Sequence, residues 1–323
     1  MRGHSSDYKA TAQQPLSSGF GKETTAQEVL VDLDLTGKMA IVTGGYSGVG
    51  LETTRALVNA GATVVVPARS LSAAETALSG IPRVEIEELD LIDPASIDSF
   101  AERFLVQGSP LHILINNAGI MSPPLTRDLR GYESQFAVNH LGHFQLTARL
   151  WPALKQANGA RVVSLSSTGI RFGGVNFDDP NYEQREYNRQ EAYGQSKSAT
   201  SLFAIALDRW GYQDNVRAFA VHPGAIMSNL IRYMSEEELD TARKSFNFKT
   251  AEQGAATSIW CATSKQLDGM GGVYCENVDI AKIVEANDIG TIPDGVMTWA
   301  IDPQLADRLW QLSEQLIGIT FPR

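Results

Sequence analysis

The chain has 323 residues, of which 43% are hydrophobic, and its 27 Lys and Arg against 37 Asp and Glu give a formal net charge of −10. The hydrophobic content excludes a disordered protein, and the negative charge argues against a nucleic-acid partner because it repels phosphate backbones. Two cysteines, Cys261 and Cys275, are too few for a disulfide scaffold, and no apolar run reaches the roughly 18 residues of a membrane span, so we expect a cytoplasmic protein without a membrane partner.

An arm of residues 1–35 precedes the first regular alternation of elements. The arm is polar in its first part, and Thr25 is suited to cap a short helix that follows it. Next, a short apolar run at 39–43 ends in glycines, residues 52–59 have helical character, and residues 63–67 form a β-branched run. This pattern predicts one strand–helix–strand unit.

The same alternation continues along the chain. Because short apolar strands that alternate with helices form parallel sheets covered on both faces, we expect an α/β fold, a Rossmann-type doubly wound parallel sheet. It makes a single domain at 36–275, and a C-terminal extension at 276–323 packs on it through a helix at 302–316 with leucines near helical spacing. The further strands are expected at 84–89, 111–116, 162–166 and 217–221, and the further helices at 95–106, 132–151 and 192–210.

Two long stretches, residues 169–191 and 227–249, interrupt this rhythm. Each follows the carboxyl end of a predicted strand, which is the edge of an open α/β sheet where ligands bind. We interpret them as walls of a substrate pocket, because long loops without a role are uncommon in compact domains. The alternative is that they are ordinary surface loops.

A glycine-rich loop, Thr43-Gly-Gly-Tyr-Ser-Gly-Val-Gly50, joins the first strand to the first helix. Gly44, Gly48 and Gly50 permit a tight turn, a close approach of the backbone to a pyrophosphate, and close packing of the helix on the strand. A glycine triplet alone is a weak signal. Here it lies between a strand and a helix, and a second β-branched strand follows, so the context predicts a bound dinucleotide.

The end of the second strand indicates which dinucleotide binds. An acidic side chain there would accept hydrogen bonds from the ribose of NAD, but Ala68 and Arg69 stand at this place. A guanidinium pairs with a 2′-phosphate, so NADP(H) is favoured over NAD(H), with a solvated surface charge as the other interpretation of Arg69. Asp90, after the third strand, is expected beside the adenine or, alternatively, serves as an ordinary helix-entry residue.

Several short motifs follow the glycine loop at strand ends and on helices. They are Asn116-Asn-Ala-Gly119, Asn139, Ser166-Ser167, Tyr193-Gly-Gln-Ser-Lys197 and Pro223-Gly224. Their combination is far more specific than any single motif, and with them the chain from 36 to 274 resembles the short-chain dehydrogenase/reductase family. The resemblance implies a catalytic tetrad of Asn139, Ser167, Tyr193 and Lys197.

Tyr193 and Lys197 lie one helical turn apart, so they share one face of the predicted helix. An ammonium beside a phenol favours the phenolate, and we expect Lys197 to lower the pKa of Tyr193 so that the tyrosine serves as general acid or base. Ser167, or alternatively Ser166, would hydrogen-bond the same substrate oxygen. The resemblance further implies that Lys197 holds the nicotinamide ribose and that Asn139 holds a water that relays protons.

The expected cofactor contacts come from the glycine loop, from strand ends and from the segment after Pro223, where Ser228 stands in place of a threonine common in the family. Hydride transfer belongs to the cofactor, and the protein supplies orientation and proton transfer. The residues expected to contact the cofactor are Gly44, Tyr46, Ser47, Gly48, Val49, Gly50, Arg69, Asp90, Leu91, Asn117, Ala118, Gly119, Tyr193, Lys197, Pro223, Gly224, Ile226 and Ser228.

A long insert separates Ser167 from Tyr193. The insert, with the sequence from Asn176 to Asn188, resembles a subgroup of the family that includes the retinol dehydrogenases and WW-domain oxidoreductases. These relatives imply a bulky apolar carbonyl or alcohol as substrate. An apolar lining agrees with such a substrate, and its expected residues are Ile120, Met121, Ile170, Phe172, Ile226, Met227 and Tyr233.

The sequence therefore predicts NADP(H)-dependent reduction of a hydrophobic or aromatic ketone or aldehyde, or the reverse oxidation of an alcohol. Two alternatives remain, an NAD-linked alcohol dehydrogenase and a non-catalytic NADPH sensor, and the complete tetrad argues against the second. The resemblance also implies a homodimer or homotetramer built through the helices that hold Asn139 and Tyr193. No metal is expected, because His140 and His143 have no third ligand at suitable spacing.

Overall fold

The computed structural model describes residues 8–285 and 294–321, so the expected arm and C-terminal extension lie in part outside the described residues. One sheet has the strand order β3-β2-β1-β4-β5-β6-β7-β8, and its neighbouring strands are parallel except for β7 and β8. The predicted doubly wound α/β fold is confirmed. The strands are β1 (Met39–Val42), β2 (Thr63–Ala68), β3 (Val84–Glu88), β4 (Ile113–Asn116), β5 (Ala160–Leu165), β6 (Val216–His222), β7 (Val273–Glu276) and β8 (Asp279–Ile280).

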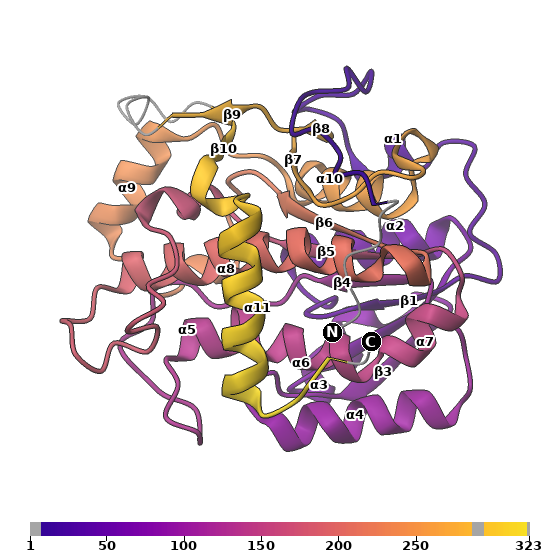
Figure 1. Ribbon diagram of the computed structural model, residues 1–323. Helices are drawn as coiled ribbons and strands as arrows, with labels where there is room; N and C mark the ends of the chain where they lie inside the picture. Colours follow the sequence, from indigo (N-terminus) through magenta and orange to yellow (C-terminus); the bar gives the residue numbers. More distant parts are fainter. Residues whose placement is uncertain (1–7, 286–293, 322–323) are drawn as a thin grey trace.

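Helices cover both faces of this sheet (Figure 1). Each face has its own apolar core, because alternate residues of the buried strands point to opposite sides. A separate pair of short strands, β9 (Ile283–Val284) and β10 (Val296–Met297), lies within the C-terminal extension. One face carries α1 (Ala26–Val29), α2 (Gly48–Asn59), α3 (Leu71–Leu78) and α10 (Ala251–Thr263), and the other carries α4 (Pro94–Val106), α6 (Gly142–Arg149), α7 (Trp151–Gln156), α8 (Arg189–Gly211) and α11 (Pro303–Ile317).

Side-chain caps determine where several helices begin and end. Thr25 caps α1 as expected, in a reciprocal capping box with Glu28. Asp302 accepts hydrogen bonds from the first backbone N–H groups of α11, and Pro303 occupies its first position. Gly318, with φ of 67°, then ends α11 in the left-handed conformation that glycine adopts without strain. The C-terminal helix is thus fixed locally at both ends.

The long helix expected at 132–151 consists of consecutive pieces. The Glu133 carboxylate accepts hydrogen bonds from the first N–H groups of α5 (Ser134–Phe136). A wide π-helical turn, Ala137–Leu141, follows α5, and α6 and α7 continue the chain. Such turns change which carbonyl each N–H reaches and occur often at functional sites. This turn contains Asn139, one of the predicted catalytic residues.

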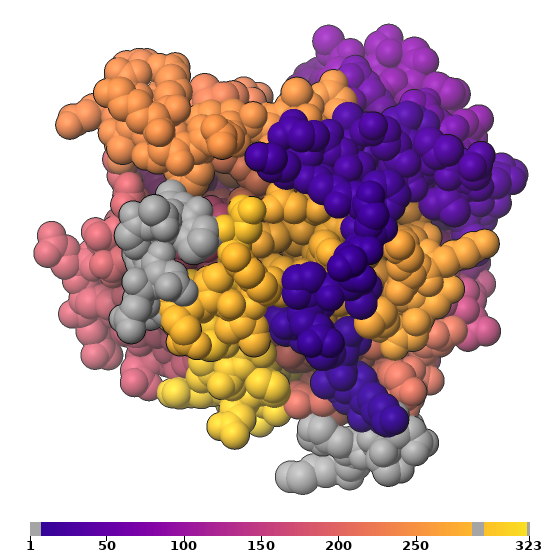
Figure 2. Space-filling model, turned by 90° about the horizontal axis from the view of Figure 1, so that it is seen from above, coloured from indigo at the N-terminus to yellow at the C-terminus, as the bar shows by residue number. Residues whose placement is uncertain are grey.

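Both terminal segments pack against the central domain. The described part of the arm lies across the chain near β7 and β8, and Figure 2 shows it as the indigo band over the orange surface. The C-terminal helix α11 crosses α8 (Figure 1) and covers the helix face through which we expected a second subunit to bind. Within the described part of the chain, no helix combines the length and the apolar character needed to cross a bilayer.

Candidate active site

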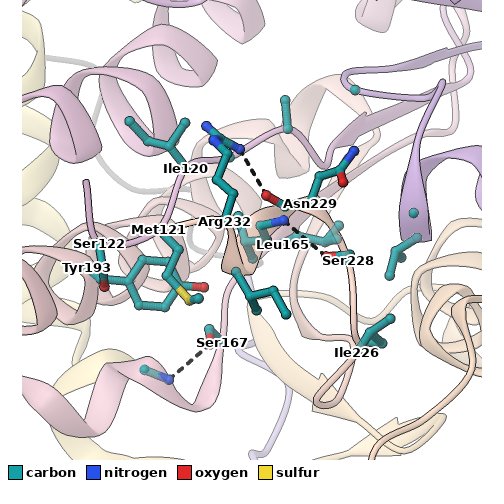
Figure 3. Close-up of a pocket in the computed structure, with 18 of the residues that line it drawn as sticks. Ile120, Met121, Ser122, Leu165, Ser167, Tyr193, Ile226, Ser228, Asn229 and Arg232 are labelled. Atoms are coloured by element: carbon teal, nitrogen blue, oxygen red, sulfur yellow. Dashed lines mark hydrogen bonds between the residues drawn. The ribbon is translucent and has the colours of Figure 1, made fainter. Parts of the chain in front are cut away.

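A cavity of about 900 Å³ opens at the carboxyl ends of the central strands. It lies where the strand order reverses between β1 and β4, which is where open α/β sheets bind ligands. Every residue that we expected to contact the cofactor lines this cavity. Of the expected tetrad, Ser167, Tyr193 and Lys197 line it as well, whereas Asn139 lies behind its wall. Figure 3 shows the part of the cavity around Tyr193 and Ser167.

The glycine loop packs so tightly against its neighbours that side chains do not fit at its glycines. Gly44 and Gly48 have φ of 64° and 51°, in the left-handed region. A Cβ on Gly50 would lie 2.3 Å from the Gly44 carbonyl oxygen and 2.5 Å from Nδ2 of Asn117. The first turn of α2 lines the cavity, and the first N–H groups of a helix lack intrahelical partners. The loop is therefore suited to hold a pyrophosphate.

A buried network connects this loop to the Asn116–Gly119 motif and to Asn139. Oγ1 of Thr43 accepts hydrogen bonds from the N–H groups of Asn117 and Ala118, both at 2.9 Å. Nδ1 of His143 lies 3.1 Å from the Asn139 carbonyl oxygen and must donate to it, because a carbonyl only accepts. Burial lowers the pKa of His143 to about 4, so its ring is neutral and Nε2 accepts the Thr43 hydroxyl proton across 3.0 Å.

Sequence reasoning considered His140 and His143 only as a metal pair, and the structure separates them. Nε2 of His140 lies 2.7 Å from the hydroxyl of Ser313 on α11, whereas His143 faces Thr43. Among the described residues, no group of three or more His, Cys, Asp or Glu could hold a metal ion. The two rings instead hold together different parts of the fold.

Asn139 fixes the backbone that follows the Asn116–Gly119 motif. Its Oδ1 accepts from the N–H of Ile120 at 2.9 Å, and its Nδ2 donates to the Ile120 carbonyl at 3.0 Å and to the Ser196 hydroxyl at 2.9 Å. Its own carbonyl accepts from His143 and from the Thr200 hydroxyl. Asn139 thus positions the backbone beside the cavity, and its expected role in holding a water stays a prediction.

Tyr193 and Ser167 both line the cavity, and the Ser167 hydroxyl acts to lower the pKa of Tyr193. Ser167 caps the short helix Thr168–Phe172, and its Oγ accepts from the N–H of Gly169 at 3.0 Å. Ser166 points elsewhere, because its hydroxyl donates to the Lys197 carbonyl at 2.8 Å. The geometry therefore pairs Ser167, and not Ser166, with Tyr193.

Burial controls the protonation of Tyr193 and Lys197. It raises the pKa of Tyr193 to about 12, although the Ser167 hydroxyl acts in the opposite direction. It lowers the pKa of Lys197 to about 8, and Nζ of Lys197 donates to the Leu165 carbonyl at 2.8 Å. Our expectation that Lys197 lowers the pKa of Tyr193 is wrong for this structure, since Nζ lies 5.8 Å from the ring centroid and desolvation is the larger effect.

Arg69 and Asp90 line the part of the cavity that lies beside the ends of β2 and β3. Arg69 is exposed and directly follows Ala68, the last residue of β2. The Asp90 carboxylate lines the cavity and also accepts from the N–H of Ile92 at 3.2 Å, while its own N–H donates to Ser96. Asp90 therefore lines the cavity a few residues before Asp93, which caps α4, and its contact with the adenine stays a prediction.

Known proteins identify the family of this chain. The family model described as short chain dehydrogenase matches residues 38–239. The chain belongs to this family. It is 43% identical over 295 residues to a "Probable oxidoreductase" of Streptomyces lividans, covering 86% of this chain and 97% of the relative. It is 38% identical over 294 residues to "Retinol dehydrogenase 12" of Mus musculus, covering 89% of each.

A solved structure supports the same assignment. An uncharacterized protein from Mycobacterium paratuberculosis superposes with a TM-score of 0.73 at 33% identity, covering 93% of this chain and 100% of that chain. The coverage extends well beyond the residues of the family model. The single-domain Rossmann-like fold of a short-chain dehydrogenase thus describes nearly the whole chain, and the predicted resemblance to the retinol dehydrogenases is confirmed.

The substrate side of this short-chain dehydrogenase is mostly apolar. Of the residues expected there, Ile170 does not line the cavity. It is fully buried in a small core near Trp299, whose Nε1 donates to the Ile170 carbonyl, because the short helix after Ser167 turns Ile170 inward and Phe172 outward. The expected residues that do line the cavity are Ile120, Met121, Phe172, Ile226, Met227 and Tyr233.

Further lining residues come from α9 (Glu236–Ser245) and its flanks, within the stretch 227–249 that we interpreted as a pocket wall without naming these side chains. Leu239, Ala242 and Phe246 line the cavity and recur at helical spacing, and Phe248 follows them. The capping box between Ser235 and Glu238 was readable from the sequence. Helical spacing after a capping box was thus the signal that could have revealed this wall.

The two long stretches differ in how much of the wall they form. Residues 227–249 line much of the cavity, whereas 169–191 contribute only Gly169, Phe172 and Gln190. The middle of the stretch 169–191 is held away from the cavity by local contacts. The Asp179 carboxylate accepts from three successive backbone N–H groups, and Arg127 donates to the carbonyls of residues 181 and 182.

Proposed function

We propose that this short-chain dehydrogenase uses NADP(H) to reduce a hydrophobic or aromatic ketone or aldehyde, or to oxidise the corresponding alcohol. The observation that carries the proposal is that Ser167 and Tyr193 line the same cavity as the glycine loop. A proton donor and a dinucleotide site that share one cavity are what hydride chemistry on a carbonyl requires.

The residues present fit a nicotinamide dinucleotide, because the loop admits no Cβ at Gly50 and presents the start of α2 to the cavity. Gly44, Gly48 and the first turn of α2 would hold its pyrophosphate, and Lys197 would hold the ribose next to the nicotinamide. When bound, this cofactor supplies or accepts the hydride. The protein supplies the proton.

Tyr193 holds that proton on its hydroxyl oxygen, since its pKa is about 12. In reduction, Tyr193 donates the proton to the carbonyl oxygen while Ser167 donates a hydrogen bond to the same oxygen. This leaves a phenolate on Tyr193, and the ammonium of Lys197, present below its pKa of about 8, would hold the cofactor ribose beside it. In oxidation, the same phenolate removes the hydroxyl proton. The protonated resting state of Tyr193 favours reduction as the direction to test first.

NADP(H) preference rests on Arg69, which is exposed at the cavity directly after β2. We expect Arg69→Ala to weaken NADPH binding roughly 10- to 100-fold, the cost of a charge-assisted contact, and to leave NADH binding unchanged. Arg55→Ala is the matched control, because Arg55 pairs with Glu52 on α2 and does not line the cavity. Equal affinities of the wild type for NADPH and NADH would favour the NAD-linked alternative.

A hydrophobic or aromatic substrate is supported by the aromatic and aliphatic rim formed by Phe172, Met227 and Tyr233. Relatives named retinol dehydrogenase support the same class of apolar alcohol or aldehyde. The test is the loss of NADPH absorbance with a panel of aromatic, aliphatic and steroid-like carbonyls. We expect the large apolar members to be consumed fastest. If NADPH binds and no carbonyl is reduced, the sensor alternative gains support.

The proposed location is the reducing cytoplasm. Cys261 and Cys275 are both buried and both free thiols. Buried neighbouring thiols that stay reduced are typical of a reducing compartment. Fractionation of cells that express the protein tests this placement.

A further inference from the structure

The terminal segments of the chain cover the two surfaces through which copies of such a domain would associate. One surface is the outer side of α6, α7 and α8, where the family resemblance places a second subunit. The other is the sheet edge at β7 and β8. We propose that the protein is a monomer in which its own C-terminal helix and N-terminal arm occupy the places of partner subunits.

On the first surface, aromatic side chains of α6 and α7 pack against aromatic side chains of the C-terminal segment. Phe144 of α6 and Trp151 of α7 are each 2% exposed or less. The ring of Phe144 lies 5.0 Å from that of Trp310 on α11, and the ring of Trp151 lies 4.9 Å from that of Phe321. Edge-to-face contacts at these distances are favourable aromatic packing. The apolar side of the catalytic helices is thus buried within one chain.

Polar contacts fix the position of α11 on this surface. Nε2 of His140, in the same π-helical turn as Asn139, lies 2.7 Å from Oγ of Ser313. The hydroxyl of Tyr132 donates to the Leu316 carbonyl at 2.8 Å. Arg209 at the end of α8 forms an ion pair with Asp307. These contacts set both the rotation and the register of α11, so the helix is a specific cover and not a loosely attached segment.

The opposite side of α11 is polar. Apart from Pro303 at its first position, its exposed residues recur along one face of the helix, and each is an amide or a charged side chain. No large apolar side chain is exposed on α11, all of whose residues are described. A second copy of the chain therefore meets a hydrophilic face where it would need an apolar one. The exposed residues are Gln304, Arg308, Gln311 and Gln315.

At the sheet edge, the arm satisfies backbone groups that would otherwise pair with another strand. The Gln13 side chain accepts from the Tyr274 N–H at 2.9 Å and donates to the carbonyls of Tyr274 and Ala281, both at 2.7 Å. The Asp279 carboxylate accepts from the N–H groups of residues 16, 17 and 18. Unpaired edge groups are templates for association, and here the arm covers them (Figure 2).

The decisive experiment is the mass of the full chain in solution, measured by sedimentation equilibrium or light scattering over a wide range of micromolar concentrations. We expect the mass of one chain throughout. A mass of two or four chains overturns the proposal. This measurement needs no substrate or cofactor, so its outcome is independent of the proposed reductase activity.

A matched pair of neighbouring substitutions tests the role of α11. Trp310→Glu places a charge on the covered side, and Gln311→Glu places the same charge on the exposed side. We expect Trp310→Glu to expose apolar surface, with increased binding of a hydrophobic dye and self-association, while Gln311→Glu stays monomeric. If Trp310→Glu does not fold, Phe321→Ala tests the contact between Phe321 and Trp151 alone. A wild-type dimer that Gln311→Glu dissociates would show that α11 is an interface.

Discussion

The cofactor side and the substrate side of the cavity are built differently. The cofactor side consists of buried strand ends and a glycine loop, linked through Thr43, Asn117 and His143 by hydrogen bonds of 3.0 Å or less. The substrate side depends on α9, none of whose described residues is buried. It is attached mainly by Arg189, which contacts Glu238 at 2.5 Å and the Tyr233 carbonyl at 2.9 Å.

This difference separates the requirements of chemistry from those of substrate choice. Cofactor and proton donor must keep fixed positions, and small displacements there reduce the rate strongly. A wall of few buried contacts opens at little free-energy cost and tolerates changes in the side chains that face the substrate. Substitutions on the cofactor side should therefore have large effects on binding and rate, and substitutions on the substrate side should mainly change KM.

The largest effect is expected from Gly50→Ala. Its Cβ would lie 2.3 Å from the Gly44 carbonyl oxygen, so the loop must move and NADPH affinity should fall about 100-fold or more. Fluorescence titration with NADPH measures the loss. Gly21→Ala is the control, because its Cβ meets no atom within 4 Å. Unchanged affinity in Gly50→Ala would show that the loop does not hold the cofactor.

The next effect is a pH dependence of reduction. Because burial lowers the pKa of Lys197 to about 8, its charge is present below that pH and is lost as the pH rises through it. The cofactor ribose then loses the charged donor that would orient it, and kcat should fall about tenfold per pH unit above about 8. Tyr193, with a pKa of about 12, keeps its proton over this range. A flat profile up to about pH 10 would contradict the role given to Lys197.

His143→Phe should have a smaller effect, because it removes contacts that act through other residues. It breaks both the bond to Thr43 and the bond to the Asn139 carbonyl, and we expect kcat to fall about tenfold with a lower free energy of unfolding. His143→Gln retains a hydrogen-bonding group near Thr43 and should recover part of kcat. A merely structural role predicts that both variants lose stability while kcat per folded molecule stays unchanged.

The smallest effect on kcat is expected on the substrate side. Phe246→Ala removes an apolar wall of the cavity without touching the cofactor loop, so KM for a large carbonyl should rise about tenfold with little change in kcat. Steady-state kinetics at saturating NADPH measure the split. Leu129→Ala, which alters an exposed leucine away from the cavity, serves as the control. A fall in kcat alone would show that this wall also positions the reacting groups.

The predictions that held depend on local sequence. The glycine loop, the strand ends and the Tyr193-to-Lys197 spacing are set by neighbouring residues, so the fold and the expected cofactor side of the cavity could be predicted from the sequence. The high pKa of Tyr193, the inward turn of Ile170 and the partners of His143 depend on burial by distant segments. The cover that α11 places on the catalytic helices depends on Trp310 and Phe321 reaching Phe144 and Trp151, and amphipathic spacing shows only that some face is covered.

The central claim is that Tyr193 supplies the proton in a cavity that binds NADPH. The most direct measurement compares wild type with Tyr193→Phe, recording NADPH affinity and the rate of NADPH consumption with the best apolar carbonyl. We predict equal affinity and a loss of rate on the order of 10²- to 10⁴-fold in the variant. A variant that consumes NADPH as fast as the wild type would contradict the account.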